Sequence, residues 1–225
     1  ERVHAHAAMT RQRVLRWVLK PLVFLAALGP LAYLTWAALT DNLSANPISD
    51  ITLETGTWTL RFLVITLAVT PLRRLTHWND AVKFRRMLGL FAFFYGTLHF
   101  ITYLWLDQFF DFSGIAKDIW KRPFITVGFT AFVAMLPLAI TSTAGWIRRL
   151  GGKNWQRLHR LIYVAAVCGV VHYWWLVKSD IQRPLIYGFI FALLLGYRVV
   201  AAVRRRAPKP AVASGSSANL LRRPS

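Results

Sequence analysis

Cysteine is almost absent from this chain, which has Cys168 as its only thiol. A single cysteine excludes an intramolecular disulfide, a zinc site built on several thiolates and an iron–sulfur cluster held within one chain. A metal bound here is therefore expected to have histidine ligands. The sequence also lacks a glycine-rich dinucleotide fingerprint and a phosphate-binding loop, so we do not expect this chain to bind a nicotinamide cofactor.

Acidic residues are scarce, with 9 Asp and Glu against 28 Lys and Arg. The formal net charge is +19, yet 56% of the residues are hydrophobic. A nucleic-acid binder of this charge would carry its basic residues on a soluble fold. Here the basic residues fall between apolar runs that are too long for globular core helices. We therefore expect a membrane protein that contacts lipid and has no nucleic-acid partner.

Six apolar runs are each close to the roughly 20 residues that a helix needs to cross a bilayer. They cover residues 18–39, 53–72, 87–105, 124–146, 158–177 and 185–203. Backbone groups in lipid must be paired within their own segment, so the sequence predicts an all-α integral membrane bundle of six transmembrane helices. Pro30 and Pro137 should kink the first and fourth helices without ending them.

The loop charges predict the orientation, because cytoplasmic loops are enriched in Lys and Arg. Of the basic residues, 22 fall on the side that holds both termini and 5 on the other side, with Arg61 inside the second span. Both termini are therefore predicted to be cytoplasmic. We divide the chain into a cytoplasmic N-terminal segment (1–16), a membrane domain (17–206) and a disordered cytoplasmic tail (207–225).

Two histidines lie inside long apolar runs, His99 in the third span and His172 in the fifth. An imidazole in hydrocarbon is costly unless it has a partner. Both spans run outward, and at about 1.5 Å per residue both histidines lie roughly 18–21 Å above the cytoplasmic ends. Imidazoles at one height on neighbouring helices can ligate a haem iron from opposite sides. The alternative is that each histidine only hydrogen-bonds a neighbouring helix.

His159 lies about 19 Å below His172, at the cytoplasmic start of the fifth span. This height suits a second redox centre. The same level in the third span is occupied by Arg85 and Arg86, which are not ordinary haem ligands. The inner site is left open between a haem with an unusual second ligand, a flavin or quinone pocket, and an interfacial histidine without a cofactor.

The remaining candidates have simpler explanations. His77 lies in the loop before the third span, where a structural metal ligand is not expected. His4 and His6 are treated as incidental. Arg61 lies a few residues inside the outer end of the second span, where it either pairs with a haem propionate or extends to the lipid headgroups.

Four runs of residues carry a resemblance to a known family. They are Phe84-Arg85-Arg86-Met87-Leu88-Gly89-Leu90, Leu98-His99, Trp155-Gln156-Arg157-Leu158-His159-Arg160-Leu161-Ile162-Tyr163 and Val171-His172-Tyr173. They resemble the MsrQ family, also called YedZ, which has a ferric-reductase-like transmembrane domain. The resemblance extends from about residue 16 to residue 206, and the run around His159 is its most specific part.

The resemblance implies b-type haem, with FMN left open. It also implies electron delivery from the quinone pool or a cytosolic flavin reductase to a periplasmic molybdopterin subunit that reduces methionine sulfoxide. The haem histidines of the family match His99, His159 and His172. Related NADPH oxidases and ferric reductases have a fourth histidine low in the third helix, where this chain has Arg85 and Arg86. This departure argues against a second bis-histidine haem.

The sequence thus leads to the hypothesis of a multi-pass cytochrome of the bacterial inner membrane. Electrons would enter on the cytoplasmic side and leave through haem b at His99 and His172. The sulfoxide chemistry would belong to a periplasmic partner docked on the outer loops, 43–55 and 107–121. One haem b is expected, with a second haem at His159 left open. The alternatives are a ferric or cupric reductase component, and a cofactor-free transporter or scaffold.

Overall fold

The structure is a computed structural model that describes residues 12–177 and 180–206, with side chains up to residue 204. In this part of the chain every regular element is a helix, which confirms the all-α prediction. The predicted tail (207–225), His4, His6 and most of the predicted N-terminal segment lie outside the described residues.

The first half of the chain forms three long helices. They are α2 (Lys20–Leu39), preceded by the π-helical turn η1 (Leu15–Leu19); α3 (Pro47–Thr76); and α4 (Val82–Thr102), which lies between the 3-10 turn η2 (Asn79–Ala81) and the π-helical turn η3 (Tyr103–Asp107). Asn46 caps α3, because its side chain accepts a hydrogen bond from the Ser49 amide. Pro47 in the first turn fixes the backbone for helix entry.

The second half alternates short and long helices. They are α5 (Phe112–Lys121), α6 (Pro123–Ile140), α7 (Ala144–Leu150), α8 (Gly152–Leu158), α9 (Leu161–Leu176) and α10 (Gln182–Arg206). The predicted end of the fourth span is wrong, because α6 stops at Ile140 and Trp146 belongs to α7, which Thr143 caps. Gly151, with a φ of 73°, makes the turn between α7 and α8 in the left-handed region that favours glycine.

Within the part of the chain that the structure describes, five helices are long and apolar enough to cross a membrane. They are Gln12–Leu39, Pro47–Thr76, Asn79–Asp107, Pro123–Ile140 and Gln182–Arg204. The fifth predicted span, 158–177, corresponds to α9, which has 16 residues and is about 24 Å long. Helix α9 is shorter than predicted because His159 and Arg160 form the turn that separates it from α8. The count of six spans and the orientation of the termini stay predictions.

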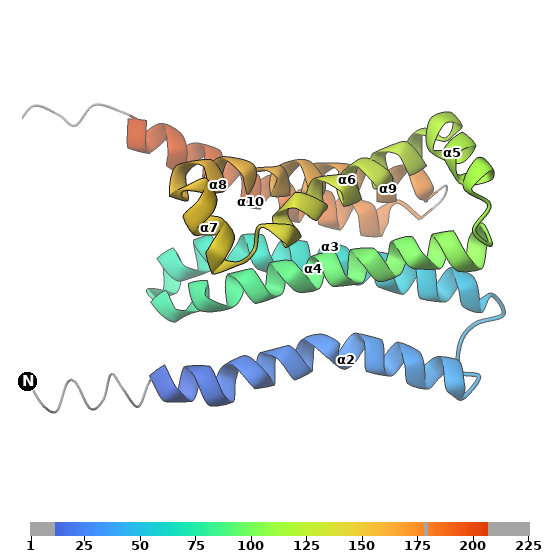
Figure 1. The fold of residues 1–225 in the computed structure, drawn as a ribbon, viewed down its shortest axis with the longest axis horizontal. Helices are drawn as coiled ribbons and strands as arrows, with labels where there is room; N and C mark the ends of the chain where they lie inside the picture. Colours follow the sequence, from blue (N-terminus) through green and yellow to red (C-terminus); the bar gives the residue numbers. More distant parts are fainter. Residues whose placement is uncertain (1–11, 178–179, 207–225) are drawn as a thin grey trace, which may run out of the picture.

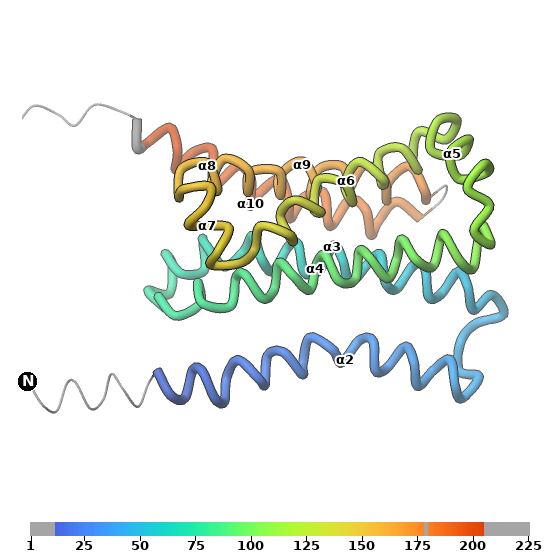
Figure 2. Tube along the Cα trace, in the orientation of Figure 1, coloured from blue at the N-terminus to red at the C-terminus, as the bar shows by residue number. Residues whose placement is uncertain are grey.

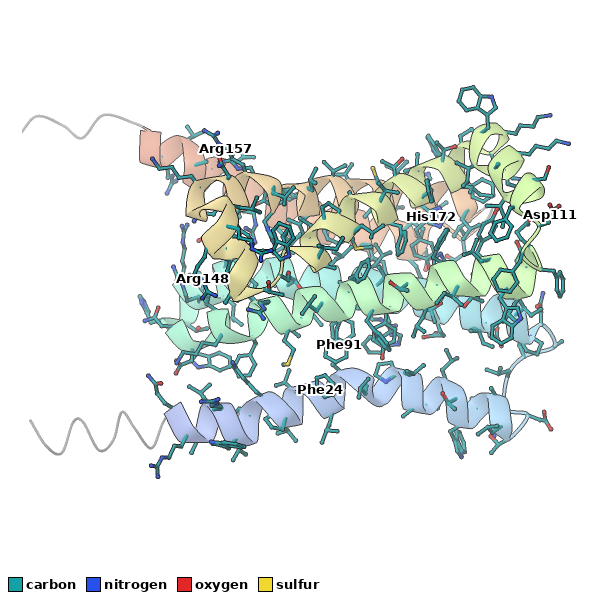
Figure 3. The ribbon with its side chains drawn as sticks, viewed as in Figure 1. Phe24, Phe91, Asp111, Arg148, Arg157 and His172 are labelled. Atoms are coloured by element: carbon teal, nitrogen blue, oxygen red, sulfur yellow. The ribbon has the colours of Figure 1, made fainter. Side chains whose placement is uncertain are left out.

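The long helices are arranged in layers (Figure 1). Helices α3 and α4 lie side by side in the middle, α6, α9 and α10 lie on one side of them, and α2 runs along the other. The long helices run between the two ends of the bundle, with α5 at one end and α7 and α8 at the other (Figure 2). The most deeply buried side chains belong to α3, α4, α9 and α10: Leu63, Leu67, Ala92, Tyr95, Ala165, Ala166 and Pro184. Phe24 of α2 packs on Phe91 of α4 with ring centroids 5.2 Å apart (Figure 3).

Tyr95 joins α4 to α2 beside the proline inside α2. Pro30 lies inside α2, as predicted, and removes one backbone hydrogen bond from the helix. Beside it, the buried hydroxyl of Tyr95 accepts a hydrogen bond from the Leu31 amide (3.2 Å) and donates one to the Ala27 carbonyl (2.8 Å). A side chain from α4 therefore satisfies backbone groups of α2 where the helix is interrupted.

Candidate functional site

A cavity of about 760 Å³ lies between α3, α4, α6 and α9. Its lining includes residues from the beginnings of α3 and α6 and from the ends of α4 and α9. These helix ends meet at the end of the bundle that carries α5 (Figure 1). In Figure 3, His172 lies closer to Asp111 at this end than to Arg148 and Arg157 at the opposite end.

His99 of α4 and His172 of α9 both line this cavity. Their ring centroids are 6.0 Å apart and their planes are inclined at 76°. Two imidazoles that bind one metal ion from opposite sides have centroids about 6 Å apart, because each metal–nitrogen bond is about 2 Å long. The structure therefore brings the two histidines to a separation that a single iron can bridge.

A backbone hydrogen bond fixes the orientation of each ring. Nδ1 of His99 is 2.9 Å from the carbonyl oxygen of Thr52 in α3, and Nδ1 of His172 is 2.7 Å from that of Phe124 in α6. A carbonyl oxygen only accepts, so each Nδ1 carries the proton and donates it. Each Nε2 then keeps its lone pair for a metal, which is how metal-binding histidines are commonly oriented.

A glycine makes room for each ring. A Cβ atom on Gly56 of α3 would lie 3.1 Å from the His99 ring, and one on Gly128 of α6 would lie 2.6 Å from Nδ1 of His172. Each glycine comes four residues after the carbonyl that accepts from the histidine, so one helical turn provides both the acceptor and the space. Sequence reasoning missed these glycines, although each lies inside or beside a predicted span.

His159 lies at the other end of the bundle, between α8 and α9, and does not line the cavity. Its Nδ1 donates to the Trp155 carbonyl at 3.0 Å, and its ring stacks on the Trp155 indole with centroids 3.7 Å apart. Nε2 is buried. The Leu138 carbonyl is nearby, but no hydrogen bond of ordinary geometry joins Nε2 to any described residue.

Two arginines accompany His159. Arg85 of α4 is within electrostatic range of both His159 and Arg198 of α10. Arg198 donates to the Tyr163 hydroxyl at 3.2 Å, and its buried Nε has no partner among the described residues. Arg85 is partly buried, whereas Arg86 is exposed. We call Arg85, His159 and Arg198 the inner cluster; its charge suits an anionic group.

His77 and Arg61 lie outside the cavity lining. His77 is exposed at the end of α3, where it adopts a φ of 56°. Because α3 begins at Pro47, Arg61 lies near the middle of the helix, and its predicted position close to the outer end is wrong. The Arg61 guanidinium stacks on the Trp58 ring, 4.4 Å from its centroid. This contact gives no support to a propionate-binding role.

Known proteins resemble this chain over most of its length. Residues 55–170 match the family described as "Ferric reductase like transmembrane component". A Herminiimonas arsenicoxydans protein named "Protein-methionine-sulfoxide reductase heme-binding subunit MsrQ" is 56% identical, over 88% of this chain and 92% of the relative. A protein of the same name from Azospira oryzae is 54% identical, over 85% of this chain and 83% of the relative. Another from Bordetella pertussis is 52% identical, over 84% of this chain and 92% of the relative. No solved structure matches the chain.

Proposed function

Since the chain belongs to the MsrQ family of ferric-reductase-like transmembrane proteins, we propose that it is the haem-binding membrane subunit of a protein-methionine-sulfoxide reductase system. His99 and His172 hold one haem b in the cavity. The observation that carries this proposal is the pair of imidazoles in one cavity, with ring centroids 6.0 Å apart and each ring anchored through Nδ1 to a carbonyl of a neighbouring helix.

When bound, haem supplies one-electron oxidation and reduction at its iron. The chain contributes the two neutral nitrogen ligands and their fixed orientation. The hydrogen bonds to the Thr52 and Phe124 carbonyls make the imidazoles more basic ligands. The apolar side chains that line most of the cavity exclude water and lower the local dielectric, which tunes the redox potential.

The membrane arrangement is part of the same proposal. Helix α9 is the fifth of six spans in the membrane domain (17–206), and both termini lie in the cytoplasm of a bacterium, with the spans in its inner membrane. The charge distribution supports this orientation, because Arg148 and Arg157 lie at one end of the bundle and Asp111 at the other (Figure 3).

Electrons enter at the cytoplasmic end, from the quinone pool or a cytosolic flavin reductase, and leave near His99 and His172. Their acceptor is a periplasmic molybdopterin-containing subunit that docks on the outer loops (43–55 and 107–121) and carries the sulfoxide-reduction site. Helix α5 and the first turns of α3 form the surface available to such a partner.

A second cofactor at the inner cluster is favoured by a separate observation. Three buried side-chain atoms lack a hydrogen-bond partner among the described residues: Oγ1 of Thr66, Nε2 of His159 and Nε of Arg198. Buried polar atoms are normally paired, so unpaired ones indicate a missing ligand. A second haem would take the lone pair of His159 Nε2 at its iron, whereas the phosphate of FMN would accept hydrogen bonds from the arginines of the inner cluster. Haem and flavin per polypeptide, measured in wild type and His159→Ala, test this assignment.

The main proposal is tested by the colour of the purified protein. We expect a Soret band that shifts on reduction with dithionite, and the loss of one haem per polypeptide from His99→Ala and from His172→Ala. His77→Ala is the matched control, because His77 is exposed and remote from the cavity, and it should bind haem like the wild type.

The alternatives predict different results. Colourless protein from haem-replete cells would overturn the proposal and favour a transporter or scaffold. Rapid reduction of iron or copper chelates without the periplasmic subunit would favour a metal reductase component.

A further inference from the structure

The cavity between His99 and His172 has two chemically different ends. Its inner part is lined by apolar side chains, among them Leu60, Leu63, Met135 and Ala165. Its outer rim carries the polar side chains of Asn46, Ser49, Asp107 and Arg122, beside apolar ones such as Ile48 and Ile119. Haem has the same asymmetry, since two carboxylates extend from one edge and apolar groups from the opposite edge. The cavity therefore distinguishes two orientations of such a ligand.

Arg122 is the only Lys or Arg among the described residues that line the cavity. It lies between α5 and α6, immediately before Pro123 in the first turn of α6. Its Nε is 3.2 Å from Oδ1 of Asp118, one turn back along the chain. Asp118 in turn accepts a hydrogen bond from the Tyr103 hydroxyl at 3.4 Å. Asp118 thus holds the guanidinium in place through one nitrogen.

Asp118 is bound through Nε, and the other two nitrogens of the Arg122 guanidinium make no hydrogen bond or ion pair with the described part of the chain. They are free to form the two parallel hydrogen bonds that a carboxylate accepts from an arginine. Arg122 also adds its charge to the positive end of the α6 macrodipole. Both features favour an anion at the outer rim of the cavity.

We propose that Arg122 binds the carboxylates of the haem held by His99 and His172, so that the carboxylate edge lies at the outer rim. The proposal rests on the proposed function and adds the orientation of the cofactor and its counter-ion. Arg61, considered for this role from the sequence, lies outside the lining. Asp107 is the only acidic residue among the described lining residues, and it is exposed to solvent, which screens its repulsion.

Haem transfer from the purified holoprotein to excess apomyoglobin tests this proposal. The Arg122 side chain is 55% exposed, so solvent weakens its ion pairs. We expect Arg122→Gln to release haem about fivefold to tenfold faster than the wild type. Arg122→Lys should recover part of the loss. Lys121→Gln is the matched control, because Lys121 is exposed and does not line the cavity, and its rate should stay within about twofold of the wild type.

Two further measurements separate ion pairing from a general loosening of the structure. Arg122→Gln should lower the haem midpoint potential, because a nearby positive charge stabilises the reduced iron, and Arg122→Lys should restore it. In protein reconstituted with the dimethyl ester of haem, which has no carboxylate charge, wild type and Arg122→Gln should release the group at equal rates.

The proposal is overturned if Arg122→Gln matches the wild type in haem release rate and midpoint potential. It is also overturned if the substitution speeds release of the dimethyl ester by the same factor as release of haem. Either result would leave the proposed function intact, since haem would still be bound. Absence of haem from the wild type would instead overturn the proposed function, and the role of Arg122 with it.

Discussion

His99 and His172 are held by the same local arrangement on two different helix pairs. In the α3–α4 pair, the Thr52 carbonyl accepts a hydrogen bond from His99 and Gly56 leaves space for its ring. In the α6–α9 pair, the Phe124 carbonyl and Gly128 do the same for His172. These two pairs are also the most extensively packed in the bundle. Close helix approach at a glycine is therefore what brings each carbonyl within reach of an imidazole.

A methyl group at Gly128 should disturb this arrangement. Its Cβ would lie 2.6 Å from Nδ1 of His172, so either the ring or α6 must move. We expect Gly128→Ala to lose most of its haem and to be destabilised by about 1–3 kcal/mol. The measurements are haem per polypeptide and thermal unfolding in detergent. Gly196→Ala, with open space around it, is the control and should keep its haem. Full haem occupancy in Gly128→Ala would contradict this account of the site.

Some of these residues could be predicted from the sequence and others could not. His99 and His172 were recognisable because a polar side chain inside an apolar run is unusual. The acceptor carbonyls of Thr52 and Phe124 could not be predicted, because every residue has a carbonyl. The rotation of one helix against its neighbour decides which carbonyl meets the histidine. Arg122 could not be singled out among the basic loop residues, since its position at the cavity rim depends on the path of the chain through α5.

Among the helices, hydropathy located the centres of the spans better than their ends. Helix α3 extends well beyond the predicted 53–72, because its first turn is polar but capped by Asn46 and begun by Pro47. The region between α6 and α9 was predicted as the end of one span and a loop, whereas it forms α7 and α8. Helix α7 begins after the cap residue Thr143, and α8 begins after Gly151. A mean hydropathy taken over many residues does not detect such single positions.

The attachment of α2 should depend on one hydroxyl group. Tyr95→Phe removes the hydrogen bonds to the Leu31 amide and the Ala27 carbonyl beside Pro30, while the ring packing is kept. We expect a loss of about 1 kcal/mol in the free energy of unfolding, measured by denaturant titration in detergent. Tyr33→Phe, on the exposed surface of the same helix, should have no effect. Equal stability of the two variants would show that Tyr95 does not hold α2.

For the molecule as a whole, the distribution of charge predicts which end faces the cytoplasm. The loops at the end with Arg148 and Arg157 are basic, and those at the other end are not. Cys168 is the only thiol, so Cys168→Ser gives a background for single-cysteine labelling. In spheroplasts, an impermeant maleimide should label Asn42→Cys at once and Asn154→Cys only after the membrane is opened. The reverse pattern would overturn the proposed orientation.

The electron paramagnetic resonance spectrum of the ferric protein tests the central claim most directly, because it reports the ligands of the iron. The paired imidazoles predict a low-spin signal from an iron with two nitrogen ligands, which is lost in His99→Ala and in His172→Ala and is restored in each variant by added imidazole. A high-spin signal from this haem in the wild type, or low-spin intensity per polypeptide that is unchanged by removal of either histidine, would contradict the claim.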